Sequence, residues 1–177
     1  TLEAVRIAKE AGALISYDPN YRASLWADTE TAVAQMKAAI PLADVMKVSD
    51  EESLLLTGAG DYDEAADRLL ESGLKLVAIT LGSKGVLIAT PESRQTVGGF
   101  AVDAVDTTGA GDSFWGGFLS CYLGLEKEIT ELTGEEMCRC AITGNAVAGL
   151  CVQKRGGIPA IPTQEAIEEF IRERTDR

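Results

Sequence analysis

The chain has 177 residues, of which 46% are hydrophobic and 25% charged, as is typical of one globular domain with a real core. Its formal net charge of −12 disfavours nucleic acid as a partner, and its lack of histidine excludes His-based triads, metal sites and general bases. No apolar run approaches the ~20 residues that a membrane span needs. Because no signal peptide is visible either, we expect a cytoplasmic protein that binds neither membrane nor nucleic acid.

Extended and helical patterns alternate along the chain, without internal repeats, low-complexity tracts or linkers. This alternation predicts a three-layer α/β/α sandwich with a mostly parallel sheet, formed by residues 1–177 as a single domain. The expected helices are 2–11, 29–40, 61–72, 112–123, 134–150 and 163–174. The expected strands are 13–17, 43–48, 76–80, 86–89 and 94–97, with a further extended run at 100–105.

Polar residues follow the first two expected strands. The string Asp18-Pro19-Asn20-Tyr21-Arg22 forms a loop where open α/β sheets bind their ligands. Arg22 is either a solvated loop arginine or a contact to an anion. Lys47, in the second strand, is either solvated or within reach of a nucleotide. The acids of Ser49–Glu52 suit the first turn of a helix by themselves, because they complement its dipole.

The string Thr80-Leu81-Gly82-Ser83-Lys84-Gly85 links two further expected strands. One interpretation is a plain hairpin turn, since Gly-x-x-Gly is common between strands. The other is a phosphate-binding loop. We favour the loop, because a second glycine-rich turn follows a neighbouring extended run.

That second turn lies in the string Asp106-Thr107-Thr108-Gly109-Ala110-Gly111-Asp112-Ser113-Phe114. A helix start favours an anion through its free N–H groups and its dipole. Gly109, Ala110 and Gly111 carry almost no side chain, so a phosphate can approach their backbone closely. Asp112 is either the N-cap of the helix or a general base for a substrate hydroxyl. Phosphoryl transfer needs an aligned acceptor, a base and charge stabilisation, and this string offers the last two.

The nine-residue string closely resembles the C-terminal signature of the ribokinase-like (PfkB) sugar kinases. The resemblance implies that Asp112 is the catalytic base and that the Gly109, Ala110 and Gly111 amides form an anion hole. It also implies that the Thr80–Gly85 turn binds ATP. The loop at 18–22, followed by Leu25-Trp26, is similar to the fructokinase and 2-keto-3-deoxygluconate kinase branches of the family.

Further roles come from the same resemblance. Ser49 and Glu52 occupy the places of an Asn-x-x-Glu motif that orders Mg²⁺ and phosphate, largely through water, with Ser49 replacing the Asn. We therefore expect Glu52 to serve Mg²⁺, and Ser49 and Lys47 to serve the nucleotide. Asn145 is placed near the adenine or ribose; the alternative is a helix-packing hydrogen bond, which a buried amide also needs.

The stretch 153–159 resembles the family's closing loop, with Gln153 where a Thr is usual. Similarity to related kinases implies a monovalent cation here, such as K⁺, held by Asp106, the Thr108 carbonyl and Gly156. The four cysteines lack zinc-type spacing, and we expect them to be small buried residues in a reducing compartment. They are Cys121, Cys138, Cys140 and Cys151.

The resemblance covers essentially the whole chain, but only the C-terminal part of a family member. The N-terminal half, with its sugar-binding motifs and its β lid, is absent, and the chain starts at Thr1 without Met. We therefore expect a processed terminus or a piece of a longer protein, inactive alone. Uncovered sheet edges and an apolar face favour a homodimer.

Three hypotheses remain open for function. The first is the catalytic part of a fructokinase, which converts ATP and fructose to fructose 6-phosphate. The second is a kinase for the sugar acid 2-keto-3-deoxygluconate, with Arg22 on its carboxylate. The third is a nucleotide-binding fragment or regulatory protein without turnover.

Overall fold

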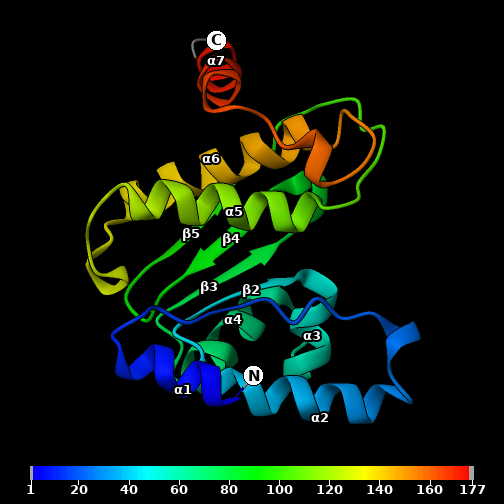
Figure 1. Cartoon of the computed structure of the whole chain (residues 1–177), viewed down its shortest axis with the longest axis vertical. Coiled ribbons are helices and arrows are strands. Elements are labelled where there is room, and N and C mark those ends of the chain that lie inside the picture. Colours follow the sequence, from blue (N-terminus) through cyan, green and yellow to red (C-terminus); the bar gives the residue numbers. More distant parts are fainter. Residues whose placement is uncertain (1, 176–177) are drawn as a thin grey trace. The chain divides into compact units, whose positions relative to one another are not determined.

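The computed structural model describes residues 2–175 and divides the chain into two compact units (Figure 1). The first unit comprises the chain up to residue 80 together with residues 89–93, and the second comprises residues 81–88 and the chain from 94 onward. The expectation of a single domain over 1–177 stays a prediction. Among the described residues, none of the helices combines the length and apolar character that a bilayer crossing requires.

The first unit is an α/β layer whose three strands are all parallel. The central strand β2 (Val45–Ser49) pairs with β1 (Ser16–Tyr17) on one side and with β3 (Leu76–Thr80) on the other. In this register Val45 lies opposite both Ser16 and Leu76. The helices are α1 (Leu2–Glu10), α2 (Thr29–Ala39), α3 (Asp50–Thr57) and α4 (Tyr62–Glu71), with short 3-10 turns at Ala23–Leu25 and Ile40–Leu42.

Burial and capping explain why these elements form. The first four residues of both β2 and β3 are buried, as expected for parallel strands covered on their faces, and α3 and α4 pack against them. Asp28 caps α2 by accepting the Thr31 N–H, and Asp61 caps α4 by accepting the Glu64 N–H.

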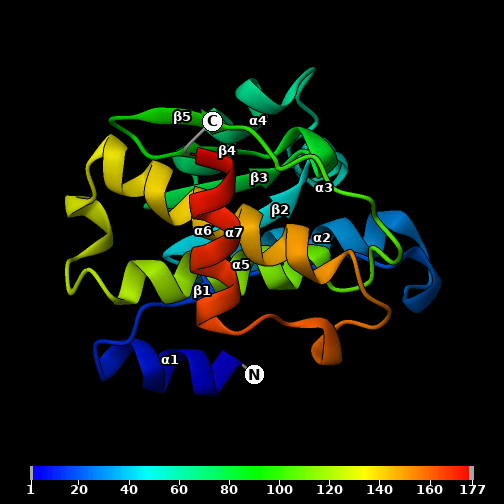
Figure 2. The ribbon, with the colours of Figure 1, turned by 90° about the horizontal axis from the view of Figure 1, so that it is seen from above.

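The second unit is built on a pair of helices. Its elements are a 3-10 turn at Gly82–Lys84, β4 (Val86–Ala89, the last residue belonging with the first unit), β5 (Arg94–Val97), α5 (Ala110–Leu123), α6 (Gly134–Cys151) and α7 (Gln164–Thr175), with further 3-10 turns at Ile129–Glu131 and Ile158–Ala160. Helix α6 packs on β5 and along α5, and α7 crosses over α6 (Figure 2).

Two glycines let α5 and α6 approach closely. A Cβ on Gly117 would lie 2.7 Å from a Val147 methyl and 3.1 Å from the Gly144 Cα, and a Cβ on Gly144 would lie 2.7 Å from the Phe114 carbonyl oxygen. Neither position has room for a side chain without movement of its neighbours. These glycines therefore serve helix packing within the second unit.

The extended run expected at 100–105 does not form a strand, and this expectation was wrong. The Val105 and Asp106 N–H groups instead both donate to the Val152 carbonyl at the end of α6, at 2.7 and 3.1 Å. Phe100 packs edge-on against Phe170 of α7, with ring centroids 5.1 Å apart. Phe100 and Val102 thus pack against α6 and α7 rather than extend the sheet.

Candidate active site

The first unit gathers polar side chains where β1 and β2 end, in a set called here the Asp18 cluster: Asp18, Tyr21, Lys47, Ser49 and Glu52. The Lys47 ammonium lies 3.0 Å from an Asp18 carboxylate oxygen, and the two side chains are only 7% and 19% exposed. The pair is therefore largely buried, where an ion pair depends on each partner to offset the loss of hydration. Lys47, expected at the nucleotide, is engaged with Asp18.

Glu52 closes the start of α3. Ser49 accepts the Glu52 N–H at 3.1 Å while a Glu52 carboxylate oxygen accepts the Ser49 N–H at 2.8 Å, which is a complete capping box. The other Glu52 oxygen accepts the Tyr21 N–H at 2.6 Å and thereby ties the 18–22 loop to the helix. Burial, followed by the charges of Asp18 and Glu52, raises the pKa of neighbouring Tyr17.

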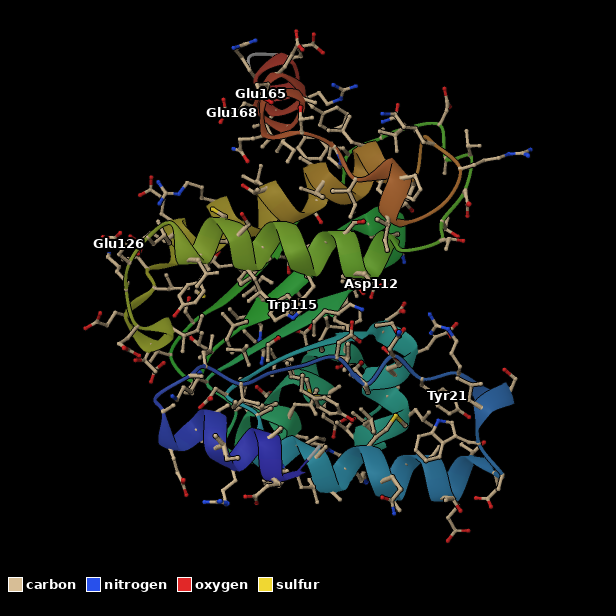
Figure 3. All side chains as sticks on the ribbon, in the orientation of Figure 1. Tyr21, Asp112, Trp115, Glu126, Glu165 and Glu168 are labelled. Carbon is tan, nitrogen blue, oxygen red and sulfur yellow. The ribbon has the colours of Figure 1, made fainter. Side chains whose placement is uncertain are left out.

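Arg22 differs from the rest of this region because it is exposed. Its guanidinium donates to the Tyr21 carbonyl at 2.9 Å, and no carboxylate among the described residues pairs with it. Figure 3 shows Tyr21 in the loop before α2; its hydroxyl lies 3.3 Å from the Thr29 hydroxyl. The loop is thus anchored through Tyr21, and the Arg22 guanidinium keeps donors available for an anion.

The second unit contains the glycine-rich turn, which opens α5. Gly109 is the N-cap, with φ of 76° in the left-handed region that favours glycine, and no side chain caps the helix. The Ala110 N–H bonds the Thr107 carbonyl and the Ser113 N–H bonds the Gly109 carbonyl. No hydrogen bond of the described residues uses the N–H groups of Gly111 and Asp112, so they remain available to an anion.

Asp112 stands in the first turn of α5, not at its N-cap (Figure 3). Its side chain is exposed and bonds no group among the described residues. The N-cap interpretation is therefore wrong, because Gly109 holds that position and the Asp112 carboxylate satisfies no backbone N–H. A free carboxylate beside two free amides has the components that base and anion hole require.

A second loop is fastened beneath this turn. One Asp106 carboxylate oxygen accepts the Thr108 N–H and the other accepts the Gly156 N–H, each at 2.9 Å. The hydrogen bond from Gly156, followed by those with Thr108, lowers the pKa of Asp106 to about 2. A Cβ on Gly109 would lie 3.1 Å from the Gly157 Cα, so the two loops are in contact. The structure thus brings together the residues expected around the monovalent cation.

The expected nucleotide turn is shaped by backbone contact with a segment the sequence did not point to. A Cβ on Gly85, whose φ is 101°, would lie 2.0 Å from the Val97 carbonyl oxygen, and a Cβ on Gly99 would lie 2.6 Å from the Ser83 carbonyl oxygen. Buried Asn145 donates its amide to the carbonyls of Val97 and Gly98, at 3.3 and 3.0 Å. The Gly98-Gly99 pair was the available sequence signal, since adjacent glycines allow such close approach.

Thr80, the first residue of the expected nucleotide turn, ends β3 in the first unit. Its hydroxyl donates to the Val48 carbonyl at 3.3 Å. Residues 81–85 belong to the second unit, where the Leu81 N–H bonds the Gly85 carbonyl at 2.8 Å and closes the turn on itself. The turn's backbone is therefore fixed by its own bonds and by the Gly98-Gly99 pair.

The donor atoms indicate which cations the site suits. Among the described residues, no three His, Cys, Asp or Glu side chains gather as a metal cage. Both Glu52 oxygens already accept N–H groups, so a contact to Mg²⁺ through water fits better than direct ligation. The Thr108 carbonyl, close to Gly157, offers the hard oxygen donor that an alkali or alkaline-earth cation prefers. Asp106 adds negative charge beside it, although both its oxygens, like those of Glu52, already accept N–H groups.

Comparison with known proteins gives one family. The sequence pattern described as "pfkB family carbohydrate kinase" matches residues 1–164. Probable fructokinase-4 of Arabidopsis thaliana is 44% identical over 174 residues, which are 97% of this chain and 52% of that protein.

Two solved structures are also similar to this chain. A fructokinase double mutant from Vibrio cholerae O395, bound to fructose, ADP and potassium ion, superposes with a TM-score of 0.87 at 35% identity, over 96% of this chain and 54% of that one. A putative ribokinase II from E. coli, in complex with ATP and Mg²⁺, gives a TM-score of 0.83 at 29% identity, over 97% and 52%. The chain spans about half the length of the curated relatives and structures it matches.

Proposed function

The chain belongs to the pfkB family of carbohydrate kinases, and we propose that the whole protein transfers the γ-phosphoryl group of ATP to a hydroxyl of fructose, giving fructose 6-phosphate. The likeness to the Vibrio fructokinase also confirms the ribokinase-like α/β fold predicted from the sequence. The observation that carries the proposal is the uncapped start of α5, where the free Asp112 carboxylate stands beside free backbone amides.

In the proposed reaction Asp112 is the base. It accepts the proton of the sugar hydroxyl, whose oxygen bonds the γ-phosphorus while the bond to the β-phosphate oxygen breaks and ADP leaves. Of the three amides expected to form the anion hole, that of Ala110 is taken by the Thr107 carbonyl, so the amides of Gly109 and Gly111, together with that of Asp112, would stabilise negative charge on the transferring group. Because the turn is built from backbone, this stabilisation needs no side chain to reorganise.

The remaining expected residues take supporting roles in the proposal. The turn at 81–85 and Asn145 would hold the nucleotide, and Asn145 does so by fixing the 97–99 segment that shapes the turn. Glu52, with the Ser49 cap, would orient water bound to Mg²⁺, which neutralises phosphate charge when present. Asp106, the Thr108 carbonyl and Gly156 would hold K⁺. In this scheme the Lys47 ammonium fixes the position of the Asp18 carboxylate through their ion pair.

A second candidate acceptor is 2-keto-3-deoxygluconate, and the exposed Arg22 favours it. Its guanidinium pairs with no carboxylate of the described residues, so it could donate charge-assisted hydrogen bonds to the carboxylate of a sugar acid. With fructose as acceptor, Arg22→Gln should lower kcat. With the sugar acid, it should raise the KM for that acid and leave the KM for ATP unchanged.

A substrate panel tests the proposal on the whole protein. ADP release is measured with fructose, other neutral sugars and 2-keto-3-deoxygluconate at equal concentrations. We expect clear preference for fructose. Preference for the sugar acid would show that the acceptor is 2-keto-3-deoxygluconate instead of fructose, and the kinase proposal would stand. If no acceptor increased ADP release, the kinase proposal would fail and only nucleotide binding would be left to test.

The activity belongs to the whole protein in this proposal. For residues 1–177 alone we expect weak Mg-ATP binding without sugar phosphorylation, which calorimetry and an ADP-release assay would measure. Sugar-dependent ADP release by these residues alone would contradict that expectation. A homodimer and a cytoplasmic location belong to the same proposal.

A further inference from the structure

Two of the four cysteines face each other across the α5–α6 interface. Cys121 lies in α5 and is partly exposed, whereas Cys140 lies in α6 and is fully buried, and the two side chains are near enough to interact electrostatically. The other two thiols point elsewhere: Cys138 donates to the Gln95 side-chain oxygen at 3.7 Å, and Cys151 donates to the Gly157 carbonyl at 3.9 Å.

The helix packing independently places Cys121 and Cys140 in the same layer of the α5–α6 interface. The Gly117 and Gly144 Cα atoms are no more than about 4.6 Å apart, because the 3.1 Å contact described above adds one Cα–Cβ bond of about 1.5 Å. The two helices run antiparallel (Figures 1 and 2). Cys121 is one turn after Gly117 and Cys140 is one turn before Gly144, so the cysteines form the next layer of the same interface.

We propose that Cys121 and Cys140 are a modification site at which a peroxide forms a reversible disulfide between α5 and α6. Disulfides join Cα atoms about 4.4–6.8 Å apart, so the proposal requires the Cα atoms of Cys121 and Cys140, one turn from the glycine contact, to come within this range. The bond would fasten the helix that begins at the Gly109 turn to the helix that carries Asn145.

Exposure decides the order of the two steps. The Cys121 thiolate attacks a peroxide oxygen, the O–O bond breaks, and Cys121 becomes a sulfenic acid as water leaves. The Cys140 sulfur then attacks the Cys121 sulfur, the S–O bond breaks, and a second water departs with the Cys140 proton. Two thiols have lost two electrons to one peroxide. Burial, and then the Cys121 contact, raises the pKa of Cys140, so Cys140 is not the thiol that reacts first with peroxide.

Tryptic mapping of the whole protein tests this pairing. Cleavage after Arg94, Lys127, Arg139 and Lys154 leaves Cys121 in peptide 95–127, Cys138 in 128–139, and Cys140 with Cys151 in 140–154. The protein is treated with hydrogen peroxide, alkylated and digested without reductant. We expect 95–127 joined to 140–154, with loss of both separate alkylated peptides and their recovery after reduction.

Four variants make the assignment specific. Cys121→Ser and Cys140→Ser should each abolish the joined peptide, whereas Cys151→Ser and the control Cys138→Ser should retain it. A join that survives Cys140→Ser would assign Cys151 instead and overturn the proposal. Recovery of 95–127 as a separate peptide after peroxide, with Cys121 alkylated or oxidised beyond the sulfenic acid, would overturn it as well.

Discussion

Helices α3 and α5 both begin with acidic residues in their first turn, yet their starts are built differently. At α3, Ser49 and Glu52 bond each other's backbone N–H groups, and Glu52 also holds the Tyr21 N–H. At α5 the N-cap is Gly109, no side chain caps the helix, and the Asp112 carboxylate is exposed. The α3 start satisfies its own donors, while the α5 start leaves donors and a carboxylate free.

This contrast separates two uses of an acidic residue at a helix start. Both Glu52 carboxylate oxygens accept backbone N–H groups, so a substitution of Glu52 should first lower the stability of the 18–22 loop and of α3. The Asp112 carboxylate holds no backbone N–H group, so a substitution of Asp112 should lower the rate of phosphoryl transfer and leave the fold intact. The predictions below test this division.

The largest effect is expected at the open helix start. Asp112→Asn keeps the size of the side chain but removes the base, so the whole protein should lose at least ~10²-fold in kcat. ATP affinity should hardly change, because the amides remain. Asp103→Asn, at another exposed aspartate of the preceding segment, is the control and should keep full turnover. Near-full turnover of Asp112→Asn would remove it from the base role.

The next effect concerns stability in the Asp18 cluster. Lys47→Met leaves the Asp18 carboxylate largely buried without its cation, which should cost about 3 kcal/mol of unfolding free energy. Arg6→Met removes the exposed ion pairs of Arg6 with Glu3 and Glu10, and should lower the unfolding free energy far less, because water screens exposed pairs. Urea denaturation compares the two variants. Equal losses would mean that burial does not distinguish these pairs.

Adjacent glycines of α5 give a smaller, paired effect. Gly117→Ala places a Cβ 2.7 Å from Val147 and should cost about 1–3 kcal/mol through overpacking. Gly116→Ala meets nothing within 4 Å and should gain about 0.5–1 kcal/mol, because alanine favours a helix interior. Thermal denaturation of both variants measures the difference. A stabilised Gly117→Ala would contradict the close helix approach.

The smallest effect is a titration beneath the Gly109 turn. The lowered Asp106 pKa means that its contribution to stability is full above the unfolded value near 3.9 and is lost as pH falls through about 2. The amide resonances of Gly156 and Thr108 should therefore shift with a midpoint of about 2 in an NMR titration. A midpoint near 3.9 would show that these amides do not hold the carboxylate.

The sequence predicted the α5 start better than the surroundings of the α3 start. Local patterns indicate the helices, the parallel core strands and the Asp106–Phe114 string, so the position of the Gly109 turn was predictable from the sequence. The Lys47–Asp18 pair joins residues 29 positions apart, and the fit of Gly85 to Val97 depends on where a separate segment runs. Alternation at 100–105 indicated a strand, but tertiary contacts with Val152 and Phe170 decided its structure.

The most direct test of the kinase proposal is to identify the product that the whole protein makes from ATP and fructose. NMR of the reaction mixture should show ADP and fructose 6-phosphate in equal amounts, and an Asp112→Asn sample should show almost none of either while still binding ATP. Intact ATP binding with no phosphorylated sugar from the unsubstituted protein would contradict the proposal.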